Sequence, residues 1–130
     1  MIILDTSVWI EFFRGKAPYR SEVSDLLGKG QALGLPWIFG ELLQGAADKN
    51  EVDYLKSFWK VIAKPETGTS ERAWIDAGIE SQKGKWFSRG IGLIDAAIVC
   101  AAIELKCPVW TLDKKLKEVL RFKRLLSESV

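Results

Sequence analysis

Four carboxylates stand in this sequence at positions where acidic residues are unusual. Asp5 and Asp113 each come directly after a predicted buried strand. Glu41 falls on the apolar face of a predicted helix, and Asp95 stands alone in a long apolar stretch. Burying an ionised carboxylate without a partner is very costly. We therefore expect cationic groups to meet Glu41 and Asp95.

The composition narrows the chemistry that these acids can support. The 130 residues include no histidine, which excludes Ser-His-Asp and Cys-His hydrolases, ribonucleases with paired imidazoles and zinc sites that need histidine. The two cysteines, Cys100 and Cys107, form neither a disulfide framework nor a zinc-site spacing. The remaining donor set is all oxygen, which suits Mg²⁺ or Mn²⁺ better than zinc or copper.

Each acid also has a purely structural explanation. Asp5 and Asp113 could cap the helices that follow them, and Asp95 could cap its helix if that helix begins later than predicted. Glu41 could pair with a buried arginine. The four acids could be explained without a functional site only if all four of these structural explanations were correct at once.

Hydroxyl groups stand beside two of the acids. Thr6 and Ser7 follow Asp5, and Thr111 precedes Asp113 by two positions. Such hydroxyls can orient a carboxylate or a metal-bound water. We expect this supporting role for Thr6 and Thr111, whereas helix capping is the preferred explanation for Ser7.

Apolar periodicity predicts the elements that must position these groups. Strands alternate with helices, which predicts a parallel sheet flanked by helices. Strands are expected over 1–4, 32–35 and 108–111, with 61–64 as an alternative strand and 122–125 as a final edge strand. Helices are expected from Thr6 or Ser7 to Gly15, over 18–27 and 36–47, from a cap at Asn50 to 62, from a cap at Ser70 to 87, and over 93–105 and 114–120. The side chains expected to point inward from the helix ending at 87 are Trp74, Ile75, Ile79 and Trp86.

This topology brings the four acids to one edge of the sheet. Asp5 and Asp113 lie past the carboxyl ends of strands, and Glu41 and Asp95 lie near the starts of helices. Sites in parallel α/β sheets form in the crevice outside the strand carboxyl ends. A metal ion held there lowers the pKa of an attacking water and offsets charge on phosphorus, so the cluster predicts metal-assisted hydrolysis of phosphodiesters.

Four segments carrying these acids resemble a known family. They are Ile3-Leu4-Asp5-Thr6-Ser7-Val8-Trp9, Phe39-Gly40-Glu41-Leu42-Leu43-Gln44-Gly45, Gly92-Leu93-Ile94-Asp95-Ala96-Ala97-Ile98 and Thr111-Leu112-Asp113. Together they closely resemble the PIN-domain ribonucleases, specifically the VapC toxins of bacterial and archaeal type II toxin–antitoxin pairs. The resemblance covers essentially the whole chain.

The resemblance implies a fold, an activity and partners. The fold would be α/β, a three-layer α/β/α sandwich on a short, mainly parallel sheet. The activity would be Mg²⁺- or Mn²⁺-dependent endonucleolytic cleavage of RNA, with Asp5, Glu41, Asp95 and Asp113 as catalytic, metal-binding residues. A VapB-type antitoxin would block the site, and the toxin would form a homodimer or a higher toxin–antitoxin assembly. Many relatives carry a basic residue and a histidine soon after the last acid, whereas here Lys114 and Lys115 follow, so no role for that histidine carries over.

The basic residues are concentrated in two segments near the acids, as binding of RNA would require, although the net charge of the chain is only +2. Residues 114–124 carry six basic groups against one acid, giving +5, and residues 83–89 carry +3, so the rest of the chain is at −6. Basic segments beside an acidic site are the electrostatic footprint of a polyanion, although Lys117 and Arg121 fit a solvated helix face equally well. The candidate RNA-binding residues are Arg14, Lys83, Lys85, Arg89, Lys114 and Lys115.

Other functions fit the sequence less well. A phosphatase of the haloacid dehalogenase type needs a second Asp where Ser7 stands, and a phosphoacceptor of the receiver type needs paired acids that are absent. A PIN-like binding module without activity would not need four intact acids. Trp9, Phe12 and Phe13 form an apolar surface beside the site, with Trp9 expected in the core and the rest available to an antitoxin or a second subunit.

The chain as a whole is expected to be one domain over 1–130. Its hydrophobic residues make up 48% of the sequence, enough to fill a core. We expect no membrane span, because no apolar run approaches roughly 18 residues. We expect no signal peptide, because Asp5 interrupts the N-terminal apolar stretch. Two cysteines without a framework predict buried thiols in a cytoplasmic protein.

Overall fold

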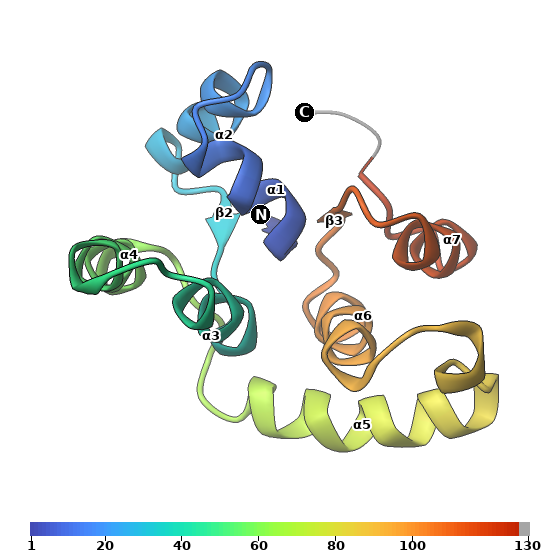
Figure 1. Ribbon diagram of the computed structural model, residues 1–130. Helices are drawn as coiled ribbons and strands as arrows, with labels where there is room; N and C mark the ends of the chain where they lie inside the picture. The colour runs from blue at the N-terminus through green and yellow to red at the C-terminus, as the bar shows by residue number, and fades with distance from the viewer. Residues whose placement is uncertain (128–130) are drawn as a thin grey trace.

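The computed structural model describes residues 1–127 as a short parallel sheet covered by helices on both faces (Figure 1). The strands are β1 (Ile2–Leu4), β2 (Ala32–Leu33) and β3 (Val109–Trp110). The helices are α1 (Thr6–Phe13), α2 (Tyr19–Gly28), α3 (Pro36–Gln44), α4 (Lys49–Val61), α5 (Thr69–Gly84), the 3₁₀ turn η1 (Phe87–Arg89), α6 (Leu93–Leu105) and α7 (Lys114–Phe122).

The sheet has the strand order β2-β1-β3, and every pairing in it is parallel. Ile3 pairs with Leu33 on one side and with Val109 on the other. All of β1 is buried, as expected for a central strand with helices on both faces. The carboxyl ends of the three strands therefore emerge at one edge.

Two single-residue bridges widen this sheet. Ala63 pairs with Leu33, so the alternative strand over 61–64 is present as a bridge, while Val61 itself ends α4. Leu126 pairs with Val109, whereas the predicted strand over 122–125 is wrong because α7 continues through Phe122. The backbone that completes the sheet lies just beyond the predicted segment.

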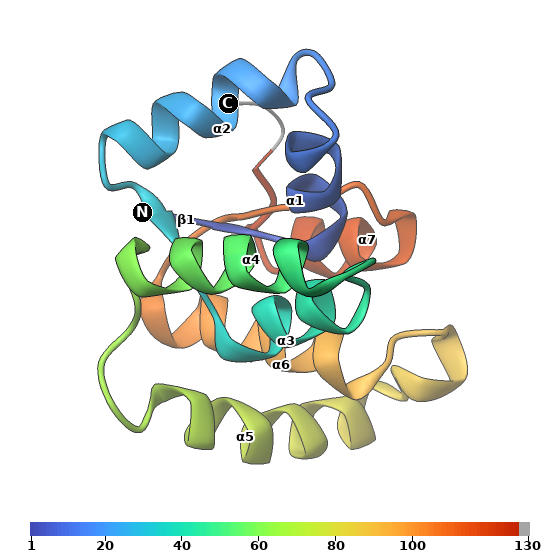
Figure 2. The ribbon, with the colours of Figure 1, turned by 60° about the vertical axis from the view of Figure 1, so that its left-hand side comes forward.

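The helices form the two outer layers. Helices α1 and α2 lie on one side of the sheet, and α3 and α6 lie on the other, with α5 packed outside α6 (Figures 1 and 2). Helix α6 has the predicted ends, and its residues from Ala96 to Ala102 are all buried. Trp9 is fully buried, as predicted. The fold is thus the expected three-layer α/β/α sandwich, and no helix within residues 1–127 has the length and apolar character to cross a membrane.

The inward face of α5 differs from the prediction. Trp74, Ile75 and Ile79 are exposed, and the buried residues of this helix are Thr69, Ala73 and Ala77. The opposing helix α6 is rich in alanine, and two helices with small residues at their contact can approach closely. The apolar side chains of α5 were therefore assigned to the wrong face, although Trp86 beyond its end is buried as predicted.

Several helix ends also differ from the predictions. Helix α4 is capped by Asp48 rather than Asn50, because the Asp48 carboxylate accepts from the Glu51 N–H at 2.9 Å. Glu51 in turn accepts from the N–H of Ala47, the residue before the cap, at 2.7 Å, so each of the two side chains satisfies one backbone donor at the start of the helix. Helix α5 begins after Gly68 and ends at Gly84, so Ser70 lies inside it.

Candidate active site

Asp5 lies at the carboxyl end of β1 and is almost completely buried. Its Oδ2 accepts hydrogen bonds from the Thr111 hydroxyl at 2.7 Å and from the Ser7 hydroxyl at 3.0 Å. It occupies the N-cap position of α1 but makes no side-chain capping bond. The capping explanation for Asp5 is therefore wrong, and the carboxylate is oriented by two hydroxyls instead.

Ser7 has a role that its sequence position did not predict. Its hydroxyl donates to Asp5 and accepts from the Leu112 N–H at 3.0 Å, so it connects the start of α1 to the segment after β3. It caps no helix. The signal in the sequence was a hydroxyl two positions after a buried acid, the same spacing that Thr111 has before Asp113.

Thr111 links two of the acids. Its side chain is buried, donates to Asp5, and accepts from the Asp113 N–H at 3.1 Å. The Asp113 carboxylate uses Oδ1 to accept from the Leu116 N–H at 2.9 Å, so the capping explanation is correct for this residue. Asp113 is nevertheless exposed at the edge of the site, and its second carboxylate oxygen, Oδ2, takes no part in the capping bond.

Glu41 lies in the second turn of α3 and is half-buried. Its Oε1 accepts from the Thr6 hydroxyl at 2.8 Å. The supporting role predicted for Thr6 and for Thr111 is thus present as hydrogen bonds, and each hydroxyl fixes one carboxylate oxygen. The buried arginine considered for Glu41 is not among its partners within residues 1–127.

Asp95 is the third residue of α6 and is also half-buried. The helix begins at Leu93 after Gly92, so Asp95 is not its cap. The pKa of Asp95 is raised to about 6, first by burial and then by the negative charges of Asp5, Asp113 and Glu41. The other three acids therefore each lie within electrostatic reach of Asp95.

No basic side chain within residues 1–127 forms an ion pair with any of the four acids. The expected cationic partners of Glu41 and Asp95 are therefore not side chains of this part of the chain. No three of the described acids or cysteines are close enough together to form a ready-made set of metal ligands. Like charges at this edge repel, and the all-oxygen donor set is of the kind that takes a hard divalent cation.

The candidate RNA-binding residues are all exposed, and they fall into two groups. Arg14 lines a groove of about 480 Å³ together with Thr6 and Glu41, and it pairs with Glu11 at 3.3 Å. Lys114 and Lys115 follow Asp113 in the first turn of α7. These three lie beside the acids.

The remaining candidates surround the end of α5. Lys83 lies 3.9 Å from Glu80, Lys85 follows the last residue of α5, and Arg89 belongs to η1. The η1 turn leads directly into α6, so this group lies on the same side of the molecule as the start of α6, at the right of Figure 2.

Comparison with known proteins finds relatives that match this chain over most of its length. The PIN domain family matches residues 2–121. Ribonuclease VapC32 of Mycobacterium tuberculosis, from strains CDC 1551 / Oshkosh and ATCC 25618 / H37Rv, is 30% identical over 122 residues, which cover 90% of this chain and 88% of that protein. A chain from the crystal structure of VapBC2 of Rickettsia felis, bound to a DNA fragment from its promoter, superposes with a TM-score of 0.65 at 17% identity, covering 96% of this chain and 93% of that one.

Proposed function

This chain belongs to the PIN domain family, and we propose that it is the toxin endoribonuclease of a type II toxin–antitoxin pair, which hydrolyses phosphodiester bonds in RNA. One observation carries the proposal: the carboxylate of Asp95, whose pKa is raised to about 6 by burial and then by the charges of Asp5, Asp113 and Glu41, forms no ion pair within residues 1–127, and neither do those three acids. The relative VapC32, a ribonuclease by name, supports the same substrate class.

We propose that Asp5, Glu41, Asp95 and Asp113 bind Mg²⁺ or Mn²⁺. When bound, the metal supplies a water of lowered pKa and positive charge to offset the charge on the phosphate. Repulsion among the carboxylates keeps them apart without a cation, and binding of one would let them draw together. The residues fit such an ion by their chemistry, since every donor is a carboxylate oxygen.

The other site residues position these carboxylates. The hydroxyls of Thr111 and Ser7 hold Asp5 in one orientation, and that of Thr6 holds Glu41. Asp113 is fixed through its capping bond to α7. Each of these bonds removes rotational freedom from a carboxylate before the ion arrives, which lowers the cost of binding it.

Basic groups beside the acids would bind the RNA backbone. Arg14 lies next to Glu41 in the same groove, and Lys114 and Lys115 follow Asp113. These cations offset the repulsion between an acidic site and a polyanion. We assign them to phosphates on either side of the bond that is cut.

The family and the apolar groove beside Glu41 both indicate a protein partner. We propose a VapB-type antitoxin that covers the groove beside Glu41, whose apolar lining includes Ile10, Phe13 and Leu42. The VapBC2 structure, a toxin–antitoxin complex by name, supports such a partner.

A homodimer is proposed on the exposed face of α5. Ile75 and Gly78 are exposed there, and Glu71 and Lys85 stand seven positions before and after Gly78. Two α5 helices crossing antiparallel at Gly78 would bring Glu71 of one copy toward the end of α5 in the other, where Lys85 follows the helix.

The cytoplasm is the compartment that suits this protein best. Cys100 and Cys107 are both buried as free thiols, and burial raises the pKa of each, that of Cys100 to about 11. Such thiols are unreactive packing groups, which is typical of proteins from a reducing compartment.

Cleavage of total RNA with Mg²⁺ or Mn²⁺ tests the proposed activity. We expect cleavage that EDTA abolishes and that Asp95→Asn lowers at least about 10²-fold. Asp53→Asn, which changes an exposed acid on α4, is the matched control and should retain full activity. Cleavage that persists in EDTA, or in folded Asp95→Asn, would contradict the metal mechanism. Binding of RNA without cleavage would instead favour an inactive binding module.

A further inference from the structure

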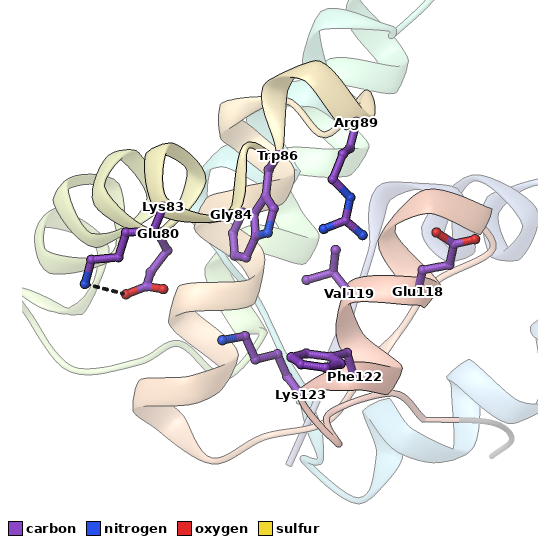
Figure 3. Close-up of a pocket in the computed structure, with 9 residues that line it drawn as sticks. All are labelled: Glu80, Lys83, Gly84, Trp86, Arg89, Glu118, Val119, Phe122 and Lys123. Carbon is purple, nitrogen blue, oxygen red and sulfur yellow. Dashed lines mark ion pairs between the residues drawn. The ribbon is translucent and has the colours of Figure 1, made fainter.

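A second cavity lies away from the four acids, between the end of α5, η1 and the last turns of α7 (Figure 3). Its volume is about 480 Å³, within the range of ligand sites. We propose that this cavity binds one base and its phosphate of a single-stranded RNA substrate, at a distance from the bond that is cut. The proposal rests on the proposed ribonuclease function and adds a separate contact to it.

An aromatic ring without a packing role marks the cavity. Phe122, at the end of α7, is 84% exposed, whereas Val119 one turn earlier is buried. Trp86 contributes a buried indole that packs over Gly84, where a Cβ would collide with it. Phe122 therefore exposes its ring to solvent beside the buried apolar side chains of Val119 and Trp86. A nucleic-acid base can stack on an aromatic ring exposed in this way.

Two cations flank this ring. Arg89 reaches from η1 toward α7, and Lys123 follows Phe122 (Figure 3). Neither forms an ion pair with any described acid. Lys83 also lines the cavity, at 3.9 Å from Glu80, too far for a strong pair. The cavity thus offers one guanidinium and one ammonium group that form no ion pair within residues 1–127, although Glu80 and Glu118 also line it.

One face of α7 connects this cavity to the acids. Lys115, Val119 and Phe122 recur at helical spacing, so they share a face. Lys115 lies over Gly90, where a Cβ would collide with its side chain. Phe122 stands nine residues after Asp113, about 13 Å along the helix. A strand of RNA bound at the acids can follow this face and reach the cavity.

The charges favour nucleic acid over protein as the occupant. Sites for single strands combine a basic groove with aromatic platforms, whereas protein interfaces are depleted in lysine. Here Lys83, Lys123 and Arg89 line the cavity with two aromatic rings and two acids, Glu80 and Glu118, so the lining carries a net charge of +1. Residues 114–124 carry a charge of +5, which extends the basic surface along the same path.

Binding of a labelled RNA tests the stacking contact. The probe is an unstructured, fluorescein-labelled 12-nucleotide RNA, and anisotropy is measured with Asp95→Asn protein so that the probe stays intact. We expect Phe122→Ala in this background to weaken binding about 10-fold and Phe122→Trp to retain it. Phe87→Ala is the matched control, because Phe87 is equally exposed but lines a different cavity, and it should bind as the parent does.

The salt dependence of binding tests the phosphate contact. Arg89→Ala and Lys123→Ala should each reduce the slope of log affinity against log salt by about 0.7, the value for one phosphate of a single strand. Lys60→Ala, an exposed lysine on α4, should leave the slope unchanged. A merely structural effect of these substitutions would lower affinity without changing the slope.

The outcomes separate this inference from the proposed function. If the wild-type protein cleaves RNA and Phe122→Ala binds the probe as Phe87→Ala does, the second contact is wrong and the ribonuclease stands. If Phe122→Ala binds RNA normally but loses self-association, the cavity is a protein interface and the inference is overturned. If Asp95→Asn binds no RNA and the wild type cleaves none, both proposals fail.

Discussion

The hydroxyl of Thr111 donates a hydrogen bond to the carboxylate of Asp5 at 2.7 Å, although the two residues are 106 positions apart in the chain. The bond joins the carboxyl ends of β1 and β3, which are neighbours in the sheet. The same hydroxyl accepts from the Asp113 N–H at 3.1 Å. One buried threonine therefore sets the positions of two proposed metal ligands relative to each other.

Thr111→Val should impair metal binding more than it impairs folding. The substitution keeps the shape of the side chain but leaves Asp5 without its shortest hydrogen bond, at a cost of about 1–3 kcal/mol in the free energy of unfolding. Loss of such a supporting bond typically lowers metal affinity 10- to 100-fold. We expect the Mg²⁺ concentration for half-maximal cleavage to rise by that factor, measured by titration.

Thr69→Val provides the matched control. Thr69 is equally buried but lies at the start of α5, away from the acids. Its substitution should leave the Mg²⁺ dependence of cleavage unchanged. An equal shift in both variants would mean that Thr111 acts through stability alone.

Asp95→Asn should stabilise the metal-free protein at neutral pH. The pKa of Asp95 is raised from 3.8 to about 6, so the native state holds a proton that the unfolded state releases between these values. Stability from this group is present below about pH 4 and is lost as the pH rises toward 6. At pH 7 the gain from Asp95→Asn is about 1 kcal/mol, after allowance for screening at a half-buried site.

Urea unfolding in EDTA measures this difference. The advantage of Asp95→Asn over the wild type should be small at pH 4 and should reach its full value by pH 7. A constant difference across this range, or a variant that is less stable at pH 7, would show that the pKa of Asp95 is not raised by burial and by its acidic neighbours.

Glu41→Gln should abolish activity while leaving the fold intact. The amide oxygen still accepts the hydrogen bond from Thr6, which is 2.8 Å long in the wild type, and one negative charge is removed from the group. We expect cleavage to fall at least about 10²-fold, with the free energy of unfolding in EDTA unchanged within about 0.5 kcal/mol. Marked destabilisation would indicate that Glu41 has a structural ion pair instead.

Mg²⁺ should stabilise the wild-type protein independently of any substrate. A ligand that binds only the folded state at ten times its dissociation constant adds about 1.4 kcal/mol. The melting temperature should therefore rise with added Mg²⁺ in the wild type and remain unchanged in Asp95→Asn. A rise of equal size in both proteins would place the ion elsewhere.

Predictions from the sequence were most accurate for segments whose structure is decided by a single physical requirement, such as the burial of apolar side chains. Helix α6 has its predicted ends because a long apolar stretch can only be a buried central helix. Asp5 and Asp95 were found because acids in apolar surroundings need an explanation, and the sheet topology then brings their positions together.

Predictions failed where partners distant in sequence decide the outcome. The face that α5 buries depends on the alanines of α6, which one helix alone does not reveal, so Ile75 and Ile79 were assigned inward. Ser7 was assigned to capping because its partner, the Leu112 N–H, is 105 positions away. The cavity at Phe122 was missed because that residue was expected in a strand.

The backbone of Val109 in β3 forms hydrogen bonds with the segment that follows α7. Its N–H donates to the Leu125 carbonyl at 2.8 Å, and its carbonyl accepts from the Ser127 N–H at 2.9 Å. The segment after α7 thus covers the outer edge of β3, and an uncovered strand edge is a template for pairing with another molecule. A chain truncated after Arg124 would expose this edge and aggregate, so affinity tags belong where the pairing of residues 125–127 is left undisturbed.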